Sequence, residues 1–151
     1  MIATKLWWDD GARATVEAGE QTHVFAAGDH ILDALRLAID HPDTVLSLIL
    51  AEPVSITEEI AGLLPQITVP TLVLASAPTS DADLTAAQRL AGEIDNGVFV
   101  IIDGAPKPVH TESRASFTEW SSSFVAIAEG LAARDGRLLS PPTPLLEGAL
   151  R

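Results

Sequence analysis

The feature of this sequence that most constrains its fold is a set of short, nearly continuous apolar runs rich in β-branched residues. Such runs lack the alternation of a strand with one wet face, so they are typical of strands buried on both faces of a parallel sheet. The stretches between them carry apolar residues at helical spacing, the pattern of βαβ units. We therefore expect an α/β fold, a three-layer sandwich of about four parallel strands flanked by helices, with strands at residues 22–27, 46–51, 71–75 and 98–102.

Helices are predicted between these strands and after the last one. The first should end at His41-Pro42, because proline disfavours helical geometry in the residue before it, and the second should begin at Thr57 as N-cap. The predicted helices cover residues 31–39, 57–64, about 83–94 and 113–133, with a further short one at 9–18. On the last long helix, the run Ser121-Ser122-Ser123 is expected to face solvent. One apolar stripe is expected to be core packing: Phe117, Trp120, Phe124, Ile127, Ala128 and Leu131.

Composition excludes several classes of function. The chain carries 21 acidic and 9 basic residues, a net charge of −12, and its unclustered cations argue against a nucleic-acid partner. No apolar run is long enough for a membrane span. The absence of cysteine excludes disulfides and thiolate zinc sites, and makes the cytoplasm the expected location. No glycine-rich phosphate loop is present, so no nucleotide cofactor is expected.

Four segments of the chain have the order and spacing of motifs from one known family. They are a strand leading into Gly28-Asp29-His30, His41 to Pro53, Ile67 to Leu74, and Gly104 through Phe117. Together they resemble the α/β-hydrolase superfamily, over about residues 9 to 131. This resemblance implies a half-domain at residues 1–136, equivalent to the C-terminal half of that fold, followed by a Pro-rich tail at 137–151. It also implies that four earlier strands are missing, together with the loop that supplies part of the oxyanion hole.

The positions that carry catalysis in that family are substituted here. By the resemblance, His30 stands at the nucleophilic serine, Thr79 at the acid and Lys107 at the general base. His110 matches a secondary histidine of the family, and Asp81 lies close enough to the acid position to replace it only if the loop shifts. Three losses at three sites predict a catalytically degenerate hydrolase.

The residues themselves leave two interpretations of the histidines open. His30 with Asp29, and with His110 from a neighbouring loop, could form an acid–base pair or half of a metal site, although no spacing singles out the further ligands. Alternatively, His30 only caps the helix that follows it. No metal site is therefore predicted, and His23, within a strand, is interpreted as a packing residue.

A polar loop at the carboxyl edge of the sheet is a candidate ligand site. Open α/β folds bind ligands at this edge, and the loop supplies Ser76, Thr79 and Asp81, with Lys107 nearby. The alternative is a plain strand-to-helix connection.

Two functions are compatible with these observations. The first is a non-catalytic module that dimerises or binds a different subunit, because the missing strands would leave the edge of residues 22–27 bare; it would also take a small apolar ligand. The Trp7-Trp8 pair would then lie at the subunit contact or remain on the surface. The second is a hydrolase of ester, lactone or C–C bonds acting through His30, His110 and Asp29.

Overall fold

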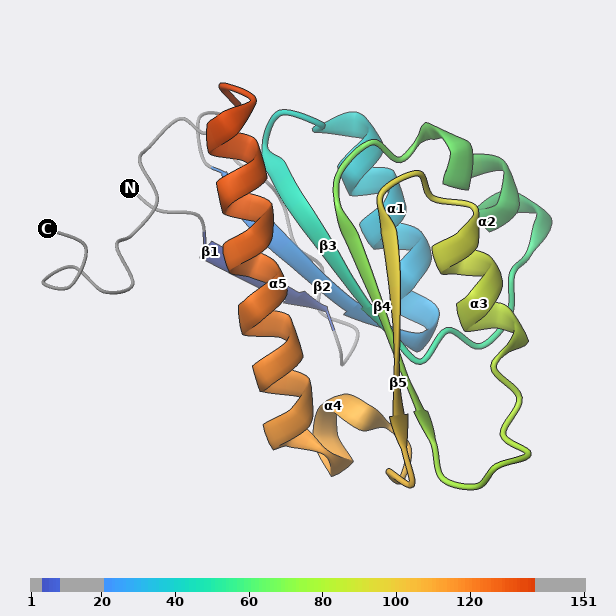
Figure 1. Cartoon of the computed structure of the whole chain (residues 1–151). Coiled ribbons are helices and arrows are strands. Elements are labelled where there is room, and N and C mark those ends of the chain that lie inside the picture. Colours follow the sequence, from blue (N-terminus) through green and yellow to red (C-terminus); the bar gives the residue numbers. More distant parts are fainter. Residues whose placement is uncertain (1–3, 9–20, 138–151) are drawn as a thin grey trace, which may run out of the picture.

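The computed structural model describes residues 4–8 and 21–137, and within them it contains one parallel sheet (Figure 1). The strands lie side by side in the order of the sequence, β1-β2-β3-β4-β5, and every neighbouring pair is parallel. The four predicted strands are confirmed as β2 to β5, and the α/β class with them. The strands are β1 (Thr4–Trp8), β2 (Thr22–Ala27), β3 (Val45–Ala51), β4 (Thr71–Ala77) and β5 (Gly97–Asp103).

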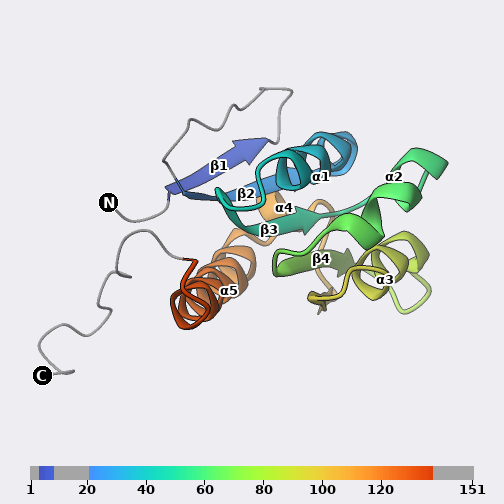
Figure 2. The same cartoon turned by 90° about the horizontal axis from the view of Figure 1, so that it is seen from above.

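Helices cover both faces of the sheet and complete the three layers (Figure 2). On one face α1, α2 and α3 pack over a core that includes Leu35, Leu50 and Leu90. On the other face α5 packs over a second core that includes Phe25, Leu74 and Phe124. The helical elements are η1 (Gly28–His30), α1 (Ile31–Asp40), α2 (Glu58–Leu63), η2 (Leu64–Gln66), α3 (Thr85–Gly92), α4 (Val109–Glu112) and α5 (Arg114–Arg134).

Two predicted helix ends are confirmed. Helix α1 ends at Asp40, two residues before Pro42, and Thr57 Oγ1 accepts a hydrogen bond from Ile60 N (3.2 Å) at the start of α2. Gly97 makes the turn into β5. A Cβ at Gly97 would lie 2.2 Å from the carbonyl oxygen of Ala91, so no side chain fits at this position between α3 and β5.

The expectation that residues 22–27 form a bare edge is wrong. Strand β1 pairs with β2 along its length, from Thr4 opposite Thr22 to Trp8 opposite Ala26. The segment is only five residues long, contains Lys5 and runs into acidic residues, so its sequence lacks the continuous apolar pattern that identified the other strands. Within the described part of the chain, the outer strands of the sheet are β1 and β5.

Helix α5 differs from its prediction in which side chains are buried. Ser121 faces the sheet and is buried, whereas Ser122 and Ser123 are exposed as expected. Trp120 and Ile127, expected in the core, are exposed. The buried positions follow a narrower stripe than the apolar residues do: Phe117, Ser121, Phe124, Ala128 and Ala132.

Some predictions lie outside the described residues. These are the helix at 9–18, the tail beyond Arg137 and the side chains of Trp7 and Trp8. Among the helices that are described, none has the length and apolar character to cross a membrane.

Candidate functional site at the carboxyl edge of the sheet

The candidate residues gather where the parallel strands end. Because all strands point the same way, the loops after β2, β3, β4 and β5 leave from one edge. They carry, in turn, Asp29 and His30, Glu52, the segment 78–84, and the segment 104–110. The edge therefore brings together the loops that the sequence singled out, and adds Glu52.

In the turn after β2, the candidate residue His30 has ordinary helical backbone angles. Gly28 takes up the left-handed conformation (φ 56°), which glycine adopts without strain, and His30 follows as the N-cap of α1 with φ −85° and ψ −5°. His30 is half-buried and its side chain makes no capping hydrogen bond, while Asp29 is exposed. The interpretation of His30 as a residue at the helix start is confirmed by its position, without a capping bond.

Glu52, which sequence reasoning missed, is the most constrained residue at this edge. It directly follows β3 and has a left-handed backbone (φ 53°), a conformation that costs a residue with a Cβ about 1–2 kcal/mol. Its carboxylate accepts hydrogen bonds from Ser76 Oγ (2.5 Å) and from Val109 N (2.8 Å), with Ser76 N at 3.3 Å. Glu52 therefore ties the ends of β3 and β4 to the start of α4.

The position of His110 is fixed by the hydrogen bond from Val109 N to Glu52 and by aromatic packing. It follows Val109, whose backbone N–H is held by Glu52, and its ring packs against Phe25 (centroids 5.4 Å apart) and Phe117 (6.2 Å). The imidazole is half-buried between β2 and α5. His110 therefore lies against aromatic side chains at the carboxyl edge of the sheet, where His30 also lies.

The four predicted ligand-binding residues are in different environments. Ser76 is buried and its hydroxyl donates to Glu52, so a role in ligand binding would require that bond to break. Thr79, Asp81 and Lys107 are exposed. The Thr79 hydroxyl donates to the Asp81 carboxylate, and this bond lowers the pKa of Asp81 below its usual 3.8. The structure thus separates Ser76 from the three polar groups at the surface.

The pKa of Asp83 gives a pH prediction for the same loop. Hydrogen bonds from Thr85, first from its side chain and then from its backbone N–H (3.0 Å to Oδ1), lower the pKa of Asp83 below 3.8. A lowered pKa means that the carboxylate stabilises the folded chain above 3.8 and that this contribution is lost as the pH falls below it. We expect the melting temperature of Asp83→Asn to lie below that of wild type at about pH 7, and the difference to shrink progressively as the pH falls below 3.8. A difference that is independent of pH in thermal melts would contradict this.

Two hollows adjoin the described residues. One, of about 250 Å³, lies at the carboxyl edge and is lined partly by Asp29, Leu32, Val54 and Ile60. Its volume is below the roughly 300–1,000 Å³ of most small-molecule sites. The other, of about 560 Å³, lies at the opposite edge, between the starts of β4 and β5 and the last turns of α5. The hollow at the carboxyl edge is thus small for a substrate of ordinary size.

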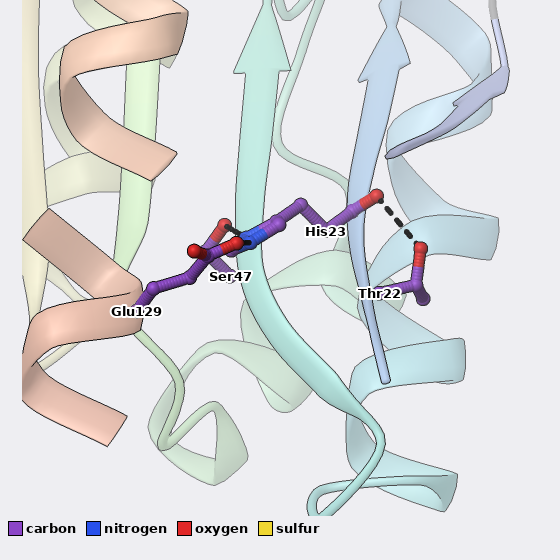
Figure 3. A network of polar contacts seen from close by, with 4 residues as sticks. All are labelled: Thr22, His23, Ser47 and Glu129. Atoms are coloured by element: carbon purple, nitrogen blue, oxygen red, sulfur yellow. Dashed lines mark hydrogen bonds and ion pairs between the residues drawn. The ribbon is translucent and has the colours of Figure 1, made fainter. Parts of the chain in front are cut away.

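A buried chain of polar groups lies away from this edge, near the start of β2 (Figure 3). His23 Nδ1 is 2.7 Å from Ser47 Oγ, and His23 Nε2 is 2.8 Å from Glu129 Oε2. A carboxylate accepts, so Nε2–H donates to Glu129, and with a neutral ring Nδ1 accepts from Ser47. His23 is 1% exposed and Ser47 is completely buried. Although serine, histidine and carboxylate are the groups of a hydrolytic triad, no substrate can reach this serine, and the interpretation of His23 as a packing residue is confirmed.

The described residues contain no group of three or more histidine or acidic side chains that could hold a metal ion. His30, His110 and Asp29 therefore do not belong to such a group within residues 21–137.

Comparison with known proteins identifies similar folds and no close relative. No protein-family model matches the chain, and no curated protein matches it by sequence. A predicted CIB-like hydrolase from Thermoplasma acidophilum superposes on 70% of this chain and 50% of its own, with a TM-score of 0.61 and 19% identity. The CarC serine hydrolase involved in carbazole degradation gives a TM-score of 0.62 and 11% identity, over 74% of this chain and 66% of its own.

A thermophilic esterase is similar over 72% of this chain and 67% of its own, with a TM-score of 0.58 and 16% identity. The chain thus spans about half the length of the first of these structures and about two thirds of the other two. At such identities the likeness concerns the path of the backbone.

Proposed function

We propose that this chain, which has the α/β-hydrolase fold over part of that fold's length, is a non-catalytic module that works by binding another polypeptide chain. The observation that supports the proposal is the backbone of the strand-to-helix turn: His30, which the resemblance places at the nucleophile, is helical (φ −85°, ψ −5°), and the positive φ falls at Gly28, which has no side chain. A nucleophile elbow instead holds its serine in a sharp, strained turn that lifts the hydroxyl above the sheet.

The strained residue at this edge supports a structural role. Glu52 has the positive φ, but its carboxylate is engaged by Ser76 and Val109. A carboxylate held in this way braces the loops and is not poised to activate a nucleophile. The strained backbone of Glu52 accompanies hydrogen bonds that link the end of β3 to the end of β4 and to the start of α4.

The other two catalytic positions support the same conclusion. Thr79, which the resemblance places at the acid position, is exposed and its hydroxyl donates to Asp81. Lys107, which the resemblance places at the base position, is also exposed. Neither Thr79 nor Lys107 is an imidazole oriented by a carboxylate, which is the pair that serves as the general base in a hydrolytic triad.

Binding of another chain is supported by the edges of the sheet. Neither β1 nor β5 has a second neighbour among the described strands, and an open strand edge is a template for pairing with another chain. A different subunit or a second copy would satisfy this requirement. The cytoplasm is the proposed compartment for this chain without cysteine, and a small apolar ligand is a weaker proposal, given the 250 Å³ of the hollow at the carboxyl edge.

The competing function is hydrolysis of an ester, lactone or C–C bond through His30, His110 and Asp29. The half-buried imidazole of His110, packed against Phe25 at the same edge as His30, favours it. An apolar wall of this kind would suit an imidazole that exchanges protons with a substrate.

Hydrolysis of p-nitrophenyl esters separates the two functions. We expect the wild-type rate to equal that of a His30→Ala/His110→Ala variant, because no activated nucleophile is proposed. His41→Ala is the matched control, since His41 is exposed in the loop before β3. A wild-type rate about a hundredfold above background, lost in the double variant and kept in His41→Ala, would establish the enzyme and refute the non-catalytic proposal.

A further inference from the structure

Four of the five large exposed apolar residues in the described part of the chain belong to β5 and α5. The five are Val54 (73%), Val98 (46%), Ile101 (40%), Trp120 (45%) and Ile127 (59%). Val98 and Ile101 belong to the outer strand β5, Trp120 and Ile127 belong to α5, and Val54 lies in the loop after β3. Scattered single hydrophobics are normal on a surface, but two on one short outer strand indicate a contact surface.

These side chains line both faces of β5. Val98 shares its face with Val100 and Ile102, which pack toward α5, because side chains alternate along a strand. Ile101 shares the opposite face with Phe99, which packs on the core under α1 and α3. Strand β5 is therefore apolar on both faces while its outer side is not paired by any described strand.

Helix α5 extends the same surface. Trp120, Phe124, Ile127 and Leu131 follow one another at helical spacing, and the last three line the 560 Å³ hollow together with Val98. In Figure 1, β5 stands clear of α5, whose main strand contacts are with β3 and β4. The hollow is thus a gap between β5 and α5 that remains open in a single copy of the chain.

We propose that β5 pairs antiparallel with β5 of a second copy, which joins two sheets into one across a two-fold axis. This inference rests on the proposed function, whose partner it identifies as the chain itself. A two-fold axis at Val100 places Val98 opposite Ile102 and Phe99 opposite Ile101 of the other copy. All facing pairs from 98 to 102 are then apolar, and no like charges meet across the axis.

Charge does not oppose this register. The axis at Val100 places Asp103 of one copy opposite the uncharged Gly97 of the other, so the two carboxylates lie at opposite ends of the paired strands. By the alternation of side chains, Asp103 shares the face of Phe99 and Ile101, which is the face away from α5.

The other outer strand is less suited to self-pairing. Strand β1 has five residues and includes Lys5, and a lysine within an edge strand hinders pairing with a further chain. Strand β5 has seven residues and no charge between Gly97 and Asp103. The structure therefore favours β5 as the dimer edge.

Cross-linking tests the register directly, because the natural chain contains no cysteine. Val100→Cys would face its own copy across the axis, so mild oxidation of the purified full-length variant should give a disulfide-linked dimer on a non-reducing gel. Val54→Cys is the matched control, since it is the more exposed residue but lies away from β5. It should cross-link far more slowly.

Mass measurement by light scattering after gel filtration tests whether the apolar residues of β5 form the dimer contact. Wild type should elute as a dimer, and Ile101→Lys should dissociate at least about tenfold more readily, while Val54→Lys should behave as wild type. Circular dichroism and thermal melts of each variant establish that it is folded.

Each adverse outcome has a defined meaning. A wild-type chain that is monomeric at every concentration overturns the inference, yet leaves a hetero-partner for the proposed function. A dimer that survives Ile101→Lys and cross-links no faster through Val100→Cys than through Val54→Cys also overturns it, because another surface then forms the dimer. Ester hydrolysis by an intact β5 dimer would refute the non-catalytic proposal alone.

Discussion

Replacing Glu52 by alanine is expected to lower the free energy of unfolding by about 3 kcal/mol. The substitution removes the acceptor for Ser76 Oγ and for Val109 N, and both Ser76 and Val109 are buried. Alanine also keeps a Cβ at a position whose φ is 53°. Urea denaturation followed by circular dichroism measures the loss.

Two further variants separate the carboxylate from the backbone strain at Glu52. Glu52→Gln retains an oxygen acceptor and should cost about 1 kcal/mol. Glu52→Gly loses the acceptor but adopts a positive φ without strain, so it should be less damaging than Glu52→Ala by about 1 kcal/mol. If alanine and glutamine were equally stable, the hydrogen bonds from Ser76 and Val109 would not be what stabilises this edge.

Replacing His23 by alanine should also destabilise the fold by about 3 kcal/mol. The ring fills a site that is 1% exposed, so its removal leaves a cavity between β2, β3 and α5. It also deprives the Ser47 hydroxyl and the Glu129 carboxylate of their shared partner. Chemical denaturation gives the change in unfolding free energy.

The control for His23 is His41→Ala, an exposed histidine whose loss should change stability by less than about 0.5 kcal/mol. Glu129→Gln keeps an acceptor oxygen and should fall between the two. An equal effect of His23→Ala and His41→Ala would show that the buried contacts contribute no net stability.

Strands β2, β3 and β4 were predictable because each is buried on both faces, which leaves a continuous apolar run in the sequence, and β5 carries a similar apolar run although it is only partly buried. Helix ends were predictable where a specific chemistry fixes them, as at Pro42 and Thr57. Strand β1 could not be found in this way, because a short outer strand need not be apolar throughout and pairing depends on β2. Its backbone partners are contributed by a segment more than a dozen residues away in the sequence.

The spacing of the apolar residues along α5 could not predict which of them are exposed. Helical spacing predicts which residues share a side, but the width of the sheet beneath decides which of them are covered. Phe117 and Phe124 are buried, while Trp120 and Ile127 extend beyond the covered area.

The candidate site was predicted only in part. The loops at the carboxyl edge follow from parallel strand direction, so the neighbourhood of His30, His110 and Asp81 was accessible to sequence reasoning. Glu52 could have been suspected as an acidic residue between a buried strand and Pro53. Its positive φ and its bond to Val109 N depend on contacts 57 positions apart, which no local pattern records.

The unbroken order of the strands determines how this sheet can meet other molecules. In open α/β sheets a crevice opens at the carboxyl edge where strand order reverses, because the helices on either side of that point diverge to opposite faces. From β1 to β5 the order never reverses, and α1, α2 and α3 all cover the same face. Among the described strands, this topology therefore forms no such crevice, and its two outer strands are the places where the proposed pairing with another chain would extend the sheet.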